Sequence, residues 1–140
     1  MTSPSIATLK DILSALGTDF KEFFSDIGTD EKISFNKSEF IEKVTDDYVL
    51  SWLVPNSQKN AMEPIHILLK AGASTDEDFP HEGEEFGFVL KGEITLMLGK
   101  KRVKVRKGES FYYPANKTHK IINKNNKDAE FIWVSSPPTF

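Results

Sequence analysis

The chain has 140 residues and a net charge of −3, with 39% hydrophobic and 28% charged residues, which suits one domain or one domain with an appendage. The absence of cysteine excludes disulfides and thiolate chemistry, and the net negative charge argues against general nucleic-acid binding. The apolar runs are too short for a membrane span and no signal segment opens the sequence, so we expect a cytoplasmic protein with no membrane partner.

Residues 1–28 carry helical patterns. We predict a helix over 4–16 that ends before Gly17, and a second short helix over 18–24 that Thr18 caps. Two short helices cannot bury their apolar faces alone, so we expect them to pack on the outside of the part that follows. The hydrophobic side chains at helical spacing are Ile6, Leu9, Leu13 and Leu16 in the first helix and Phe20, Phe23 and Phe24 in the second.

Residues 29–140 read as one strand after another, with aromatic and β-branched residues punctuated by Gly, Pro, Asn and Asp. Many short strands without intervening helices are typical of a β-sandwich or a small barrel, so we predict an all-β second domain. Gly99 and Lys100 mark the turn of a hairpin. The predicted strands cover 32–35, 47–54, 64–71, 86–92, 93–99, 101–107, 110–114, 119–124 and 130–136.

Two other polar features have ordinary structural explanations. The basic run 100–107 alternates charged residues with Val103 and Val105, which favours a strand with a solvated outer face; a phosphate-binding patch is the alternative. His66 has no motif around it, and we expect it to face solvent or to pack in the wall of the fold.

Two segments carry polar residues at fixed spacing. They resemble the two signature motifs of the cupin family, whose first motif is glycine, five residues, His-x-His, three or four residues, glutamate, six residues and glycine. Phe79 stands where the first histidine is expected, and Asn116 stands where the second motif has a glycine. Gly72 precedes the first segment by nearly the expected interval. The other matching residues are His81, Glu85 and Gly92 in the first segment, and Gly108, Pro114, His119 and Asn123 in the second.

The resemblance implies a double-stranded β-helix, the jelly-roll barrel of cupins, with the two short helices before it. The stretches "DYVLSWLVPNSQKNAMEPIHILLKAGA" and "FIWVSSPPTF" resemble a narrower group, the sensor domains of transcriptional regulators that join a cupin to a lambda-repressor-like helix-turn-helix domain. Residues 1–28 resemble the last two helices of that DNA-binding domain, so residues 29–140 are expected to be the effector-sensing cupin domain.

This resemblance implies a sensor rather than an enzyme. Its expected partners are a small-molecule effector and a second copy of the chain in a homodimer, and operator DNA is contacted only through helices that precede this sequence. The alternative is a stand-alone metal-dependent cupin enzyme, a dioxygenase or an isomerase. The helical segment and the missing first histidine both favour the regulator.

Metal-dependent cupins bind their ion through three histidines and a glutamate. This sequence keeps His81, Glu85 and His119, a set of two imidazoles and one carboxylate that suits Fe, Zn, Ni or Mn. Phe79 cannot coordinate. The alternative is a site without metal, in which the same three side chains recognise the polar groups of an organic ligand.

We expect these three side chains to form the polar end of an aromatic and aliphatic cavity. Phe79 is expected to close the place of the missing fourth ligand. Strand alternation sends only part of the remaining aromatic residues inward, so some of them should line the walls of the ligand site. These candidates are Phe88, Phe111, Tyr113 and Trp133.

Overall fold

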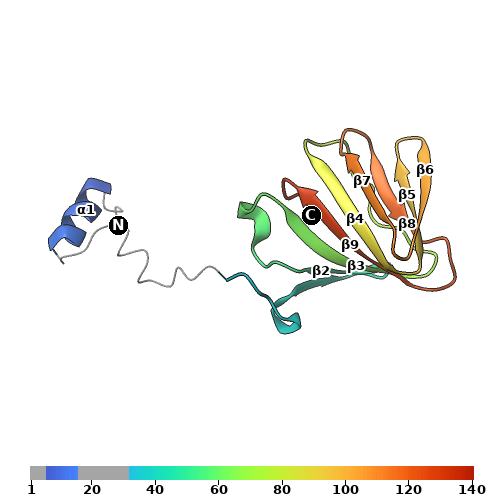
Figure 1. Ribbon diagram of the computed structural model, residues 1–140, viewed down its shortest axis with the longest axis horizontal. Helices are drawn as coiled ribbons and strands as arrows, with labels where there is room; N and C mark the ends of the chain where they lie inside the picture. The colour runs from blue at the N-terminus through green and yellow to red at the C-terminus, as the bar shows by residue number, and fades with distance from the viewer. Residues whose placement is uncertain (1–5, 16–31) are drawn as a thin grey trace. The chain divides into compact units, whose positions relative to one another are not determined.

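The computed structural model describes residues 6–15 and 32–140, which belong to two units, 1–34 and 35–140, each treated by itself (Figure 1). In the first unit, helix α1 spans Ile6–Ala15, within the first predicted helix. The second predicted helix, over 18–24, lies outside the described residues, and the expected packing of both helices stays a prediction. None of the described helices is both long enough and apolar enough to span a bilayer.

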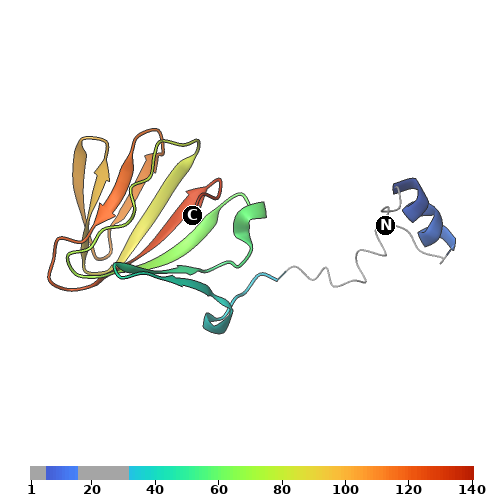
Figure 2. The ribbon, with the colours of Figure 1, turned by 180° about the vertical axis from the view of Figure 1, so that it is seen from behind.

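The second unit consists of two antiparallel sheets, as Figure 1 and the view from behind in Figure 2 show. One sheet has six strands in the order β1-β2-β3-β9-β4-β7, and the other has three in the order β6-β5-β8. Short 3-10 turns precede β1 and β3. The elements are η1 (Lys37–Glu39), β1 (Ile41–Val44), β2 (Tyr48–Trp52), η2 (Ser57–Lys59), β3 (Glu63–Leu69), β4 (Glu84–Lys91), β5 (Glu93–Leu98), β6 (Lys101–Arg106), β7 (Ser110–Pro114), β8 (His119–Ile122) and β9 (Ala129–Ser136).

The all-β prediction is confirmed, with one error at the start of the domain. Residues 32–35 were predicted as a strand and are not one, whereas the first strand, β1, lies at Ile41–Val44. All four β1 residues are exposed, so the strand has no buried side to give an alternating pattern. Its pairing with β2 defines it instead, a case in which tertiary context outweighs local propensity.

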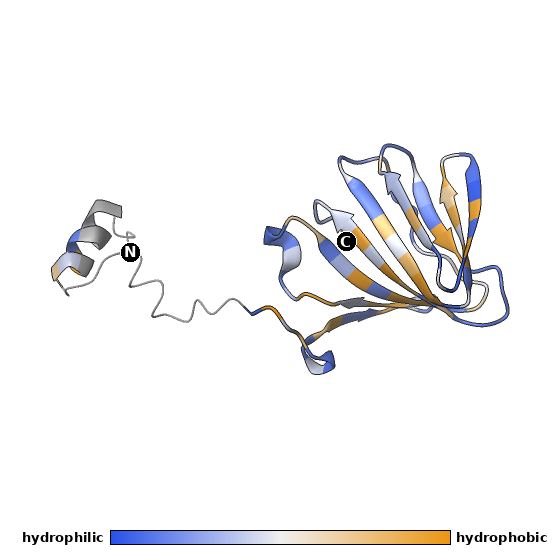
Figure 3. Ribbon diagram, in the orientation of Figure 1, coloured by the Kyte–Doolittle hydropathy of each residue, from blue (hydrophilic) through white to orange (hydrophobic). Residues whose placement is uncertain are grey.

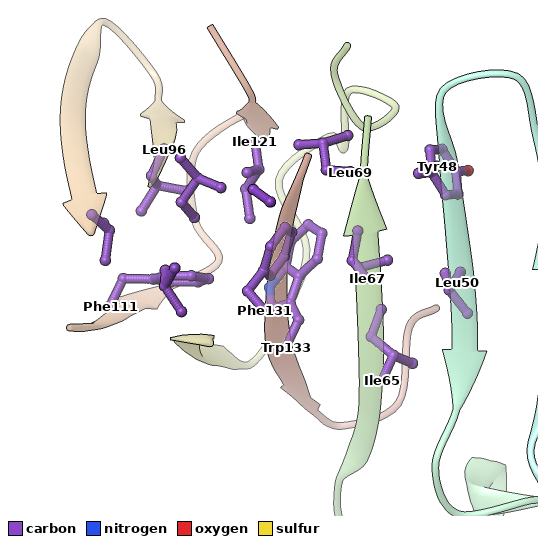
Figure 4. Packing of buried hydrophobic residues seen from close by; sticks show 14 of the residues in the cluster. Tyr48, Leu50, Ile65, Ile67, Leu69, Leu96, Phe111, Ile121, Phe131 and Trp133 are labelled. Carbon is purple, nitrogen blue, oxygen red and sulfur yellow. The ribbon is translucent and has the colours of Figure 1, made fainter. Parts of the chain in front are cut away.

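Successive side chains of a strand point to opposite faces, and this alternation places the core between the two sheets. Figure 3 shows hydrophobic and hydrophilic residues following one another along the strands. In β3 the buried side chains are every second residue, and β9 follows the same pattern with Phe131 and Trp133. Figure 4 shows these residues packing with Leu96 and Ile121 of the three-stranded sheet. Each large apolar side chain that is fully buried contributes roughly 1.5–3 kcal/mol.

A glycine in β4 permits one close contact in this core. Gly87 faces inward between Glu85 and Val89, and a Cβ on Gly87 would overlap the ring of Phe111 in the neighbouring strand β7. The ring of Phe111 therefore lies directly on the β4 backbone, next to the inward-facing Glu85.

The C-terminal segment is held by a buried carboxylate. Glu63 is fully buried, and its Oε1 accepts hydrogen bonds from the backbone N–H groups of Thr139 (3.1 Å) and Phe140 (2.6 Å). Its Oε2 accepts a long hydrogen bond of 3.4 Å from Ser57 Oγ. Nearby, Gly83 has a φ of 109°, and a Cβ there would overlap the carbonyl oxygen of Ser136, so only glycine fits this approach of the two segments.

Candidate functional site

Three side chains from the two motifs meet in the interior. His81 lies just before β4, Glu85 lies in β4 and His119 begins β8. Glu85 Oε2 is 2.8 Å from His81 Nε2 and 3.0 Å from His119 Nε2. Within residues 6–15 and 32–140, this is the one group of histidine and acidic side chains whose ligand atoms converge closely enough to hold a metal ion.

The cluster joins the two sheets. Glu85 belongs to the six-stranded sheet and His119 to the three-stranded sheet, so the 3.0 Å contact between them crosses the interior of the barrel. The turn that carries His81 is fixed to the end of β7 in the six-stranded sheet, because the His81 N–H donates to the carbonyl of Ala115 and the Ala115 N–H donates to the carbonyl of Gly83. These contacts hold the side chains of His81, Glu85 and His119 in a fixed arrangement.

Both imidazole rings present the same nitrogen to the interior. His119 Nδ1 lies 2.9 Å from the carbonyl oxygen of Lys117, and His81 Nδ1 lies 3.0 Å from that of Glu82. A carbonyl oxygen can only accept, so each Nδ1 carries a hydrogen and donates. In the neutral rings each Nε2 then has a free lone pair that points toward Glu85.

Glu85 has one satisfied oxygen and one unsatisfied oxygen. The Tyr113 O–H donates to Oε1 at 2.7 Å. In the described part of the chain, Oε2 and His119 Nε2 are buried without a well-formed hydrogen bond, although they lie 3.0 Å apart. Lone pairs on Oε2 and on both Nε2 atoms therefore face one another, an arrangement that needs a proton or a cation among them.

The directions of the pKa shifts agree with the need for a positive charge beside Glu85. Burial raises the pKa of Glu85, but its contacts with His119 and Tyr113 outweigh burial and leave that pKa below its usual value. Burial lowers the pKa of His119, and the contact with Glu85 outweighs it, so the pKa lies above its usual value. Burial, together with the charge of Glu85, raises the pKa of Tyr113, which keeps its hydroxyl protonated as a donor. The cluster thus favours a carboxylate next to a positive charge.

The geometry also fits a divalent ion. Bonds of about 2.1 Å place adjacent ligands of an octahedron about 3.0 Å apart. The two N···O separations at Glu85, 2.8 and 3.0 Å, match that edge. Two imidazoles and one carboxylate are also a donor set that suits Fe(II) and similar ions. The residues present are therefore suited to holding such an ion.

Three of the four aromatic candidates for the walls are buried. Trp133 lines a cavity of about 150 Å³ that Asp78 also borders, together with Tyr48 and Phe140. Tyr113 lies against His119, with ring centroids 5.1 Å apart. Phe111 and Tyr113 also border a separate space of about 400 Å³ between β7 and the pair β5 and β6. Trp133 and Tyr113 are thus near the cluster, with Phe111 beside them.

Two expected positions are wrong. Phe79 does not close the place of a fourth ligand, because its side chain is 77% exposed. Phe79 follows Asp78, which pairs with His119; directly opposed residues share a face, so Asp78 faces the site and Phe79 faces solvent. Phe88 also points outward, at 38% exposure, because the inward positions of β4 are the odd-numbered ones, Glu85, Gly87 and Val89.

Asp78 is the site residue that the sequence did not single out. Its Oδ2 lies 3.5 Å from His119 Nε2, and burial raises its pKa although His119 partly offsets that effect. A signal for it exists in the sequence. Counting five residues after Gly72, as the first cupin motif requires, leads to Asp78 and not to Phe79.

The other polar features lie away from this cluster. His66 is on the outer face of the six-stranded sheet, where it pairs with Glu130 at 3.3 Å. Both border a depression of about 540 Å³, larger than the interior cavity but without converging ligand atoms. The charged residues of the basic run 101–106 are exposed, in agreement with a solvated outer face.

Comparison with known proteins identifies the fold and related chains. The chain is 26% identical over 140 residues to the HTH-type transcriptional regulator PuuR of Escherichia coli, covering 99% of this chain and 76% of that protein. The crystal structure of the cupin domain of an XRE family transcriptional regulator from Enterobacter cloacae matches with a TM-score of 0.60 and 21% identity, covering 67% of this chain and all of that one.

Enzymes share the same fold. Hydroxypropylphosphonic acid epoxidase from S. wedmorenis matches with a TM-score of 0.66 and 24% identity, over 94% of this chain and 74% of that one. These similarities confirm the jelly-roll fold expected from the motifs. The model of the cupin domain family matches residues 65–135, a span that contains all three converging ligands and half of the chain. The chain therefore belongs to the cupin family.

Proposed function

We propose that this chain is the effector-sensing part of a transcriptional regulator, and that its barrel binds a small polar molecule beside a divalent cation. The observation that carries the proposal is the convergence of Glu85 Oε2 with two histidine Nε2 atoms in a buried, electron-rich cluster. The similarity to PuuR along nearly the whole chain supports the regulatory part.

The cluster supplies three ligands and fixes their orientation. His81 Nε2, Glu85 Oε2 and His119 Nε2 would hold the ion, while the Lys117 and Glu82 carbonyls keep both rings in the required tautomer. Tyr113 holds the second oxygen of Glu85 through its hydroxyl. When bound, the ion would supply a positive charge that binds an anionic or carbonyl oxygen of the effector.

The neighbouring cavity would receive the rest of the effector. Its walls combine aromatic side chains, among them Trp133 and Phe140, with the carboxylate of Asp78. A small apolar space with a few polar groups at one end is the usual composition of a small-molecule site. We propose that occupancy of this space changes how the DNA-binding parts of the regulator are held.

Residues 1–28 belong, in this proposal, to a helix-turn-helix domain, and residues 29–140 form the sensor. A homodimer would present two such domains to the half-sites of an operator. Edge strand β1 is a candidate for the dimer contact, because Ile41 and Val44 are 49% and 70% exposed on it and unpaired edges favour association. We place the regulator in the cytoplasm, where its operator would be.

The test uses metal-free and metal-loaded protein. Native mass spectrometry of the purified chain should show one divalent ion per chain, and a library of small polar metabolites should raise its melting temperature only when the ion is present. Glu85→Gln should abolish both effects. This 140-residue chain alone should show no sequence-dependent gel shift, whereas the same chain joined to a complete helix-turn-helix domain should bind operator DNA with an affinity that the same metabolite changes.

The second candidate is a metal-dependent cupin enzyme. The observation in its favour is that three protein ligands leave coordination positions open to a substrate, as catalytic sites do. The two functions separate in one experiment. Turnover of a bound metabolite by the metal-loaded protein, lost in Glu85→Gln, would support the enzyme, and binding without turnover supports the sensor.

A further inference from the structure

We propose that Asp78 is the fourth ligand of the metal site and replaces the first histidine of the cupin motif. This inference rests on the metal site proposed above and adds one residue to it. In the structure, Asp78 contacts His119 without being part of the three converging ligands. The reasons for assigning it to the ion are its backbone position, the nitrogen that it contacts and the charge of the set.

The backbone places the Asp78 side chain on the correct face. Asp78 and His119 form an antiparallel bridge and exchange both backbone hydrogen bonds, at 2.9 and 3.0 Å. Two residues that oppose each other in this way direct their side chains to the same face of the sheet. His119 is fully buried in the interior, so Asp78 shares its face, whereas the next residue, Phe79, faces solvent.

The contact is to the nitrogen that would bind the ion. The ring of His119 has its Nδ1 occupied by the Lys117 carbonyl, and Asp78 Oδ2 approaches the other nitrogen, Nε2, at 3.5 Å. A residue that only orients a metal-bound histidine contacts the nitrogen that does not bind the metal. Asp78 is on the opposite side, where two ligands of one ion lie about 3–3.5 Å apart for bonds of about 2.1 Å.

The charge of the completed set matches a divalent cation. Glu85 and Asp78 contribute two negative charges and the neutral histidines none, so the site and its ion would be electrically neutral. Neutrality matters most for the fully buried Glu85 side chain, since the Asp78 side chain is 43% exposed. Two imidazoles with two carboxylates are also richer in oxygen than three histidines with one glutamate. Such a set favours Mn(II) and Fe(II) more than the histidine-rich set does.

The chain offers matched controls for this assignment. Asp76 lies two residues earlier in the same segment, and its carboxylate accepts a hydrogen bond from the Tyr48 hydroxyl at 3.1 Å rather than contacting a histidine. Asp76→Asn therefore removes the same charge without removing a ligand. Phe79→His places an imidazole at the position that the sequence motif suggested but that faces solvent.

The experiment is calorimetric titration of the metal-free protein with MnCl₂ and, separately, with NiCl₂. Asp78→Asn should weaken Mn(II) binding at least about tenfold, while Asp76→Asn and Phe79→His should stay within about twofold of the wild type. Asp78→His should shift the preference toward Ni(II) by about tenfold, because it creates a third imidazole ligand. The melting temperature of each metal-free variant shows whether it is folded.

Two results would overturn the assignment: Mn(II) affinity unchanged in Asp78→Asn, or an equal loss in Asp76→Asn. If Asp78→Asn does not fold, Asp78→His decides, because an unchanged preference between Mn(II) and Ni(II) contradicts a ligand at position 78. A wild-type protein that binds neither ion contradicts the three-ligand site itself. Wild-type binding that persists in Asp78→Asn contradicts Asp78 alone, so the two failures are distinguishable.

Discussion

Two buried glutamates show how differently this barrel uses the same side chain. Glu63 in β3 receives backbone hydrogen bonds from Thr139 and Phe140 on one oxygen and a contact from Ser57 on the other. Glu85 in β4 receives one hydrogen bond, and its second oxygen faces two ring nitrogens without a well-formed hydrogen bond in the described part of the structure. Both oxygens of Glu63 have donors within the protein, whereas Oε2 of Glu85 would be satisfied by the ion that we propose.

The comparison shows that burial alone does not identify a functional carboxylate. Both side chains are essentially inaccessible, at 0% and 1% exposure. The chemistry of their neighbours distinguishes the two glutamates, because backbone N–H groups are fixed donors that do not titrate near neutral pH and do not bind a cation, whereas histidine rings can do both. If this distinction is correct, substitutions at Glu63 change stability and substitutions at Glu85 change binding.

The largest effect is expected at Glu63. Glu63→Ala leaves two part-buried N–H groups without their acceptor and opens a cavity in place of a fully buried side chain, so the free energy of unfolding should fall by about 3 kcal/mol. Urea denaturation measures this change. Glu63→Gln keeps an acceptor oxygen for the same N–H groups and is the matched control, with an expected loss of about 1 kcal/mol. A loss below about 1 kcal/mol in Glu63→Ala would contradict the structural role.

The reverse pattern is expected at Glu85. Glu85→Gln replaces a charged ligand by a neutral amide of the same shape, so the affinity for Mn(II) should fall about 100-fold while the metal-free protein loses no more than about 1 kcal/mol of stability. Calorimetric titration and urea denaturation of the same preparation provide both numbers. Unchanged affinity together with a large loss of stability would place Glu85 in the same class as Glu63.

A smaller effect is expected where a neighbour acts on Glu85. Tyr113→Phe keeps the ring next to His119 and removes the hydroxyl that donates to Glu85 Oε1. Because partners of metal ligands tune affinity, Mn(II) binding should weaken about tenfold, with a loss of about 1 kcal/mol in stability. Titration of the variant against the wild type tests this, and an affinity equal to the wild type would show that the hydroxyl does not orient the ligand.

The smallest effect is expected for the ion pair on the outer face. His66→Ala removes the contact with Glu130, in which both side chains are partly exposed, so the stability should change by less than about 0.5 kcal/mol. Mn(II) affinity should be unchanged, which makes this variant a control for the other three. Altered metal binding in His66→Ala would mean that the interior cluster does not contain all the ligands.

The sequence predicted the part of the site that depends on regular strands. Glu85 was placed in the interior because alternation and motif spacing agree in β4, and the structure has it there. The sequence did not show which of Asp78 and Phe79 faces the interior, because both lie in a segment that has no strand pattern of its own. That segment is positioned by bridges from Ser74 to Ile122 and from Asp78 to His119, which pair residues 48 and 41 positions apart.

In the rest of the fold too, elements with a local sequence pattern were predicted and elements fixed by distant contacts were missed. The hairpin at Gly99 and the strands β2 to β9 were predicted because their patterns are local, and the exposed edge strand β1 was missed because its pattern is not. The role of Glu63 had no local signal either, since its two backbone hydrogen-bond donors are 76 and 77 positions along the chain. Long-range hydrogen bonds to the backbone leave no recognisable spacing in a sequence.

The position of the cluster between the two sheets has a thermodynamic consequence. An ion held by Glu85 and His119 would have a ligand in each sheet, so its binding free energy would add to the free energy that keeps the sheets together. Adding the ion would then slow the exchange of backbone amide hydrogens in both sheets together. The barrel would open as one unit rather than one sheet at a time. Depletion of the ion in a cell would then loosen the whole barrel, not only the binding site.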